Sequence, residues 1–177
     1  QEVQFGPYKV LAEAPKDELM TVTTRYIYET RAVAKACIKK DPYSKTGCQI
    51  MNLANQRKNI LTSSTSGAVK IVKVTENIVP EDRDTVTLVF NVDVEKASTG
   101  NLYDESKADY PTCRSEEKQS KRISGEISGL PQGNIQCKEA ELNEKNVGTL
   151  ECEASGIRLI DSRGNTLTED YEPEISI

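Results

Sequence analysis

The clearest hydrophobic pattern in the chain lies between residues 67 and 95. In the stretch TVTLVFNVDVE every second residue is apolar, and only Val89 interrupts the polar positions; the apolar positions are Val86, Leu88, Phe90, Val92 and Val94. This period of two predicts a β-strand with one apolar face. The preceding AVKIVKVTENIV predicts a partner strand, and PEDRD predicts the turn of an antiparallel hairpin.

A helical pattern precedes this hairpin. From Lys16 to about Lys40, acidic residues occupy the first turn, lysines occupy the last, and Asp41-Pro42 ends the segment. Apolar residues recur on one side at Leu19, Val22, Tyr26, Val33 and Cys37. We therefore expect a long helix packed across the apolar face of the hairpin, with residues 3–13 as an opening strand.

The rest of the chain predicts connectors and short strands. Residues 50–66, which contain LTSSTSG, are interpreted as a connector. Short strands with Gly and Pro turns predict a β meander after residue 121. The predicted fold class is α+β. A small antiparallel sheet with one long helix across it forms residues 1–95, a polar linker or long loop forms 96–121, and a β-rich meander lobe forms 122–177.

Charge and length exclude several classes of protein. The net charge of -5 over 177 residues argues against a nucleic-acid partner, because phosphate binding normally needs a basic face. No apolar run reaches the roughly 18 to 20 residues of a transmembrane helix, so we predict no membrane span. The chain begins at Gln1, which favours a signal peptide removed from a longer precursor.

The absence of histidine removes the usual general base and the usual nitrogen ligand of zinc or haem. None of the phosphate-loop or nucleophile-elbow motifs occurs either. We therefore predict no enzymatic activity, no catalytic or cofactor-binding residue, no metal site and no cofactor.

Two of the five cysteines bracket CKEAELNEKNVGTLEC, residues 137–152. If a turn at Asn143–Asn146 joins two strands, antiparallel pairing sets Cys137 opposite Cys152 and Lys138 opposite Glu151. A disulfide there would close a loop of about 15 residues, worth roughly 3 kcal/mol through loop-closure entropy. Two reduced, buried thiols are the alternative.

The remaining cysteines suggest a second bridge. Cys37 falls near the predicted helix end and Cys48 follows the turn-rich DPYSKTG, so a bridge would tie this connector back to the helix. Cys113 is then left as a free thiol, an intermolecular bridge or the partner of a cysteine in a removed segment. Two disulfides favour an oxidising compartment, the periplasm or the cell exterior.

Residues 1–95 resemble a known module. The order PYKVLAEAP, TRAVAKACIKK, GAVKIVKVTENIV and DTVTLVFNVDVE is similar to the amino-terminal module of the bacterial flagellar T-ring protein and flagellar outer-membrane lipoprotein group. The resemblance implies a periplasmic, non-enzymatic part that docks onto an outer-membrane or motility assembly. Cys37 and Cys48 depart from that module, and no family binding residue carries over.

The resulting functional prediction is a secreted or periplasmic interaction or structural protein of a bacterial cell-envelope assembly. It would bind protein partners through a sheet edge or a loop. A surface adhesin or pilus-type subunit is the alternative, and a thiol-dependent enzyme using Cys113, with Arg114 beside it, is a further one. The oligomeric state does not follow from the sequence.

Overall fold

The computed structural model describes residues 28–41, 43–44, 47–48, 58–102, 121–130, 133–159, 165, 167 and 169–177. These residues form an all-β fold of three antiparallel sheets and include no helix. It follows that no helix within the described ranges has the length and apolarity needed to cross a membrane. The predicted opening strand at residues 3–13 lies outside these ranges.

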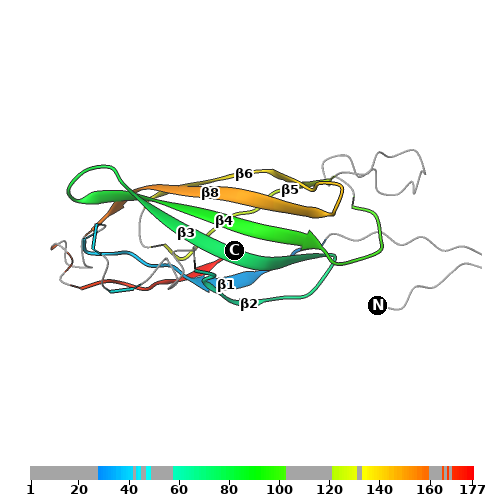
Figure 1. Ribbon diagram of the computed structural model, residues 1–177, viewed down its shortest axis with the longest axis horizontal. Helices are drawn as coiled ribbons and strands as arrows, with labels where there is room; N and C mark the ends of the chain where they lie inside the picture. The colour runs from blue at the N-terminus through cyan, green and yellow to red at the C-terminus, as the bar shows by residue number, and fades with distance from the viewer. Residues whose placement is uncertain are drawn as a thin grey trace, which may run out of the picture.

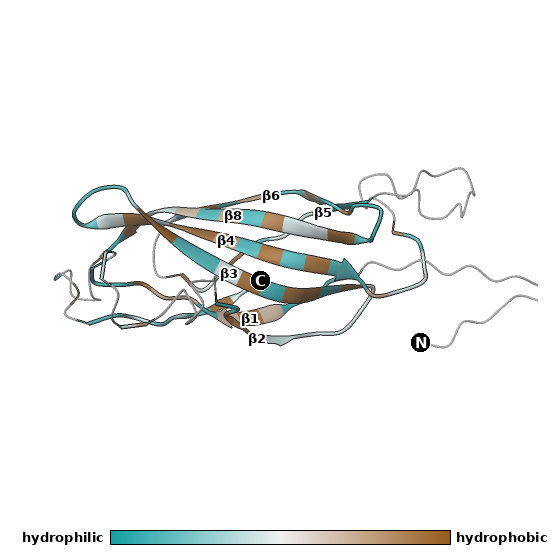
Figure 2. Ribbon diagram, viewed as in Figure 1, coloured by the Kyte–Doolittle hydropathy of each residue, from teal (hydrophilic) through white to brown (hydrophobic). Residues whose placement is uncertain are grey.

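The largest sheet has four strands in the order β3-β4-β8-β6. Its strands are β3 (Val69–Pro80), β4 (Thr85–Lys96), β8 (Val147–Arg158) and β6 (Asn134–Lys138). The predicted hairpin is confirmed, since β3 and β4 pair from Val69–Lys96 to Pro80–Val86. All five predicted apolar positions of β4 are buried. Figure 2 shows the resulting alternation of hydrophobic and hydrophilic bands along β4 and β8.

A three-stranded sheet covers the apolar face of the four-stranded one (Figure 1). Its strands, in the order β2-β1-β9, are β2 (Leu61–Ser64), β1 (Ala32–Lys35) and β9 (Glu174–Ser176). One core cluster joins Phe90 and Leu88 of the larger sheet to Ala34 and Ile175 of the smaller one. A short pair, β5 (Arg122–Ile123) with β7 (Ala140–Glu141), completes the sheets. The architecture is therefore a two-layer β-sandwich.

The predicted helix is wrong over its described part. Residues 32–35 are β1, which pairs with β2 on one side and β9 on the other. Ala32, Ala34 and Ala36 are all buried, so this segment follows a period of two rather than 3.6. Alanine's high helix propensity conceals that alternation, and pairing with two strands overrides the propensity. The apolar face of β4 packs on this strand layer instead of on a helix.

The strands after residue 121 join the sheets that contain the strands of residues 1–95. β8 and β6 complete the sheet begun by β3 and β4, whereas β9 pairs with β1. Both sequence ranges, 1–95 and 122–177, therefore contribute strands to both large sheets. The LTSSTSG segment, interpreted as a connector, contains β2, whose side chains are exposed or half-buried and so leave little apolar signal.

Replacing the central aromatic of this core tests the sandwich. Phe90 is fully buried in β4, so we expect Phe90→Ala to lower the free energy of unfolding by about 3–5 kcal/mol. Val89→Ala on the outer face of the same strand is the matched control, with an expected loss of about 1 kcal/mol or less. Urea denaturation measures both, and equal losses would contradict the assigned faces.

Candidate functional site

Two disulfides are formed, Cys37–Cys48 and Cys137–Cys152, with S–S distances of 2.01 and 2.04 Å. Both predicted pairings are confirmed. The reduced, buried thiols considered for Cys137 and Cys152 are thereby excluded. Cys113 takes part in neither bridge and lies outside the described residues.

The Cys137–Cys152 bridge joins β6 to β8 in the predicted register. Cys137 pairs with Cys152 and Lys138 with Glu151. On the outer face the Lys138 ammonium donates to the Glu151 carboxylate at 2.6 Å, and this hydrogen bond raises the pKa of Lys138. At the hairpin turn, the Asn143 side-chain oxygen accepts from the backbone N–H of Lys145. This bridge therefore fastens an edge strand to the centre of the sheet.

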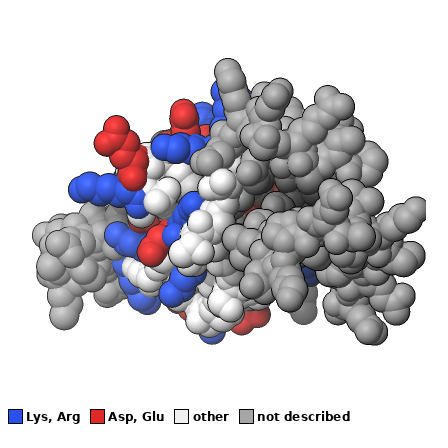
Figure 3. All heavy atoms as spheres, turned by 90° about the vertical axis from the view of Figure 1, so that its right-hand side faces the viewer, with Lys and Arg blue, Asp and Glu red and all other residues white. Residues whose placement is uncertain are grey.

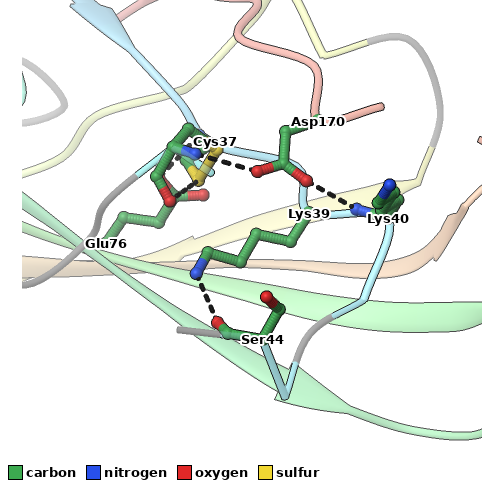
Figure 4. Close-up of a disulfide and its surroundings, with 7 residues drawn as sticks. Cys37, Lys39, Lys40, Ser44, Glu76 and Asp170 are labelled. Carbon is green, nitrogen blue, oxygen red and sulfur yellow. Dashed lines mark hydrogen bonds between the residues drawn. A yellow bond between two sulfur atoms is a disulfide. The ribbon is translucent and has the colours of Figure 1, made fainter. Parts of the chain in front are cut away.

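The Cys37–Cys48 bridge closes a loop that follows β1, and the C-terminal segment holds the base of that loop (Figure 4). One Asp170 oxygen accepts the backbone N–H of Lys40 at 3.1 Å, and the other accepts that of Cys48 at 2.8 Å. Gly47 makes this approach possible, because its φ is +89° and a Cβ there would lie 1.7 Å from Oδ2 of Asp170.

Side chains within the loop fix its far part. Lys39 is buried, and its Nζ donates to the carbonyl of Ser44 at 2.7 Å. The carbonyl of Asp41 accepts the Ser44 N–H, and the Asp41 carboxylate accepts the Tyr43 N–H. The Tyr43 side chain is 80% exposed at the end of this turn. The loop therefore presents an aromatic side chain from a base fixed by covalent and hydrogen bonds.

Glu76 connects this loop to the four-stranded sheet. It lies on β3 opposite Phe90, is only 1% exposed, and its Oε2 accepts the backbone N–H of Cys37 at 2.8 Å. Its Oε1 is the one fully buried side-chain nitrogen or oxygen, among the described residues, that has no hydrogen-bond partner. Burial raises the pKa of Glu76 to about 8, although the Cys37 hydrogen bond lowers it. The carboxyl is therefore mainly protonated at neutral pH.

Sequence reasoning missed both Glu76 and Asp170. Glu76 carries a usable signal, because Val74, Glu76 and Ile78 occupy alternate positions of the predicted strand and place a charge on its apolar face. Asp170 carries none, since its partners at Lys40 and Cys48 are more than 120 residues away in the sequence.

In the ranges that the structure describes, no group of three or more Cys, Asp or Glu side chains is placed to hold a metal ion. A hollow of about 170 Å³ lies on the outer face of β6 and β8, and its lining combines polar and apolar surface. It includes the Lys138–Glu151 ion pair.

These features define a disulfide-bonded β-sandwich with a closed, aromatic-tipped loop. Comparisons with protein-family models, with curated proteins and with solved structures found no match for the chain. The resemblance to the flagellar T-ring module therefore stays a prediction.

Disulfide mapping tests the geometry of both bridges. Because the Cα atoms of Cys37 and Cys48 lie 5.9 Å apart and those of Cys137 and Cys152 4.0 Å apart, we expect only these two linked peptide pairs in the oxidised monomer. Proteolysis after alkylation without reductant, followed by mass spectrometry, identifies them. A linked pair containing Cys113 and any of these four cysteines would contradict the assignment.

The raised pKa of Glu76 predicts a pH-dependent stability. The folded protein binds this proton more tightly than the unfolded chain, so the Glu76 contribution is fully present below about pH 4.5, decreases as the pH rises, and is lost above about pH 8. We expect the stability of Glu76→Gln relative to the native protein to rise by about 1.4 kcal/mol per pH unit within that window.

Urea denaturation at pH 5, 6, 7, 8 and 9 measures this difference. Glu153→Gln is the matched control, because Glu153 is exposed on the outer face of β8. If the difference in unfolding free energy between Glu76→Gln and the native protein does not change with pH, the Glu76 carboxyl is hydrated in the folded protein.

Proposed function

We propose that this protein is a non-enzymatic interaction module of an oxidising compartment, the periplasm or the cell exterior, and that it binds a protein partner through the Cys37–Cys48 loop. The observation that carries the proposal is Tyr43, 80% exposed on a loop whose base is fixed by a disulfide and by Asp170. A side chain whose own backbone is already held by a hydrogen bond, as that of Tyr43 is by Asp41, loses little conformational entropy on binding, and Tyr is enriched among residues that dominate binding energy.

The chemistry of the loop base supports this role. The Asp170 carboxylate is occupied by two backbone amides, and the Lys39 ammonium donates to a carbonyl. These charged groups therefore hold the loop in shape. The exposed side chain of Tyr43 is then available to a partner.

The two disulfides support a location outside the reducing cytoplasm. A bacterial envelope assembly, with motility or outer-membrane components as partners, is the setting that we propose within such a compartment.

The surface at the end of the sandwich opposite the Cys37–Cys48 loop carries charges of both signs. Figure 3 shows Lys and Arg side chains there together with Asp and Glu, and Lys70 of β3 lies across from Glu95 of β4. Such a mixed surface favours a protein partner over a nucleic acid.

The adhesin or pilus-subunit alternative gains no separate support from the described residues. The thiol-enzyme alternative depends on Cys113, which lies outside them. Neither is advanced further.

Site-specific photo-crosslinking tests the role of the loop. We expect a photo-reactive phenylalanine analogue at Tyr43 to give a discrete crosslinked species in intact source cells. The matched control carries it at Val147, an exposed residue paired with Glu95 at the opposite end of the sandwich. Partner mass is read from immunoblots, and the partner is identified by mass spectrometry. Crosslinks at Val147 but not at Tyr43 would place binding elsewhere.

A further inference from the structure

Glu76 is a buried carboxyl group that neither the disulfide nor the recognition role explains. It comes from β3, an edge strand of the larger sheet, and extends between the two layers to the base of the Cys37–Cys48 loop (Figure 4). A buried polar group usually has all its hydrogen bonds satisfied. The carboxyl of Glu76 has one hydrogen bond and one oxygen without a partner.

The loop base has two kinds of attachment. On one side it is held by the C-terminal segment, through Asp170 and through the reciprocal backbone hydrogen bonds of Ile38 and Tyr171. On the other side, the N–H of Cys37 is bonded to Glu76. The Glu76 bond thus links the loop base to β3, whereas the Asp170 and Ile38 bonds join the loop base to the C-terminal segment.

The surroundings of Glu76 suit the neutral acid and not the carboxylate. Across the strand pair it faces Phe90, and Ala36 and Ile38 of the opposing layer are buried around the Cys37 amide. The nearby charged groups are already engaged. Lys39 donates to Ser44, and Asp170 accepts the amides of Lys40 and Cys48. Only burial and the Cys37 hydrogen bond shift the pKa of Glu76, so no cation compensates an ionised form.

We propose that Glu76 is a pH-operated latch, which holds the base of the Cys37–Cys48 loop against the sandwich when protonated and releases it when ionised. Ionisation requires water at Oε1, and water reaches that oxygen when the Cys37 end of the loop moves away from β3. The disulfide and the Asp170 hydrogen bonds keep the loop closed on itself during this movement. The loop therefore moves as a preformed unit and does not unfold.

The latch acts in a defined pH range. In the opened form Glu76 is hydrated and titrates near its ordinary value of 4.5, whereas in the closed form its pKa is about 8. The population of the opened form therefore rises about tenfold per pH unit between these values and levels off above pH 8. The opened form is therefore rarest under acidic conditions and most populated under mildly alkaline ones.

Amide hydrogen exchange followed by NMR on the full, oxidised chain tests the latch without any partner. After correction for intrinsic exchange, we expect the protection factor of the Cys37 amide to fall about tenfold per pH unit from pH 5 to pH 8. In Glu76→Gln it stays constant over that range. The amide of Val92, in the central strand β4, reports global unfolding and keeps a higher protection factor at each pH.

Asp170→Asn is the control for the other titratable group at the loop base. It removes a charge without touching Glu76, so we expect lower protection at every pH with the native slope retained. A native Cys37 protection factor that is constant with pH would overturn the proposal. So would protection of Cys37 and Val92 that is equal at each pH, because the pH effect would then be global unfolding. Since no binding is measured, failure here leaves the crosslinking test of Tyr43 unaffected.

Discussion

Burial of β4 is the constraint on which the rest of the structure depends. Its hydrogen-bonding edges are both taken, by β3 over eleven paired positions and by β8 over ten, and its inward face is apolar at five successive alternate residues. A strand with these properties must be covered on its inner face. The β2-β1-β9 sheet is the cover, and the buried alanines of β1 join Phe90 and Leu88 in one core cluster. The loop site follows β1 of this covering sheet, and Glu76 reaches its base from β3 of the larger one.

Local patterns predicted the parts of the fold that depend on neighbours in sequence. The β3–β4 hairpin and the Cys137–Cys152 register follow from alternation and a short turn, and both are confirmed. The wrong prediction of a helix at β1 has a physical cause. An isolated Ala-rich segment favours helix, and what makes it a strand is pairing with β9 about 140 residues later. Pairing between distant segments leaves no periodic pattern of hydrophobic residues in the sequence. The sandwich itself could therefore not be predicted from local patterns.

The candidate site divides in the same way. Cys37 and Cys48 were predictable because they are eleven residues apart and flank a turn-rich stretch. Asp170 was not, because its role depends on the C-terminal segment lying beside the loop. Glu76 stands between these cases. Its alternation with Val74 and Ile78 marks it as an inward carboxyl, yet only the structure shows that it meets the amide of Cys37. A charge at an apolar position of a strand is therefore a signal worth following.

The placement of Cys137 on an edge strand has a consequence for assembly. β6 is five residues long and is paired on one side, by β8, which makes it the type of strand that molecules exchange when they domain-swap. The disulfide between Cys137 and Cys152 prevents this exchange, because β6 cannot join the sheet of another copy while the bond is intact. The oxidised protein therefore keeps β6 as the edge strand of its own sheet. High concentrations of the protein in one compartment do not then lead to exchange of β6 between copies.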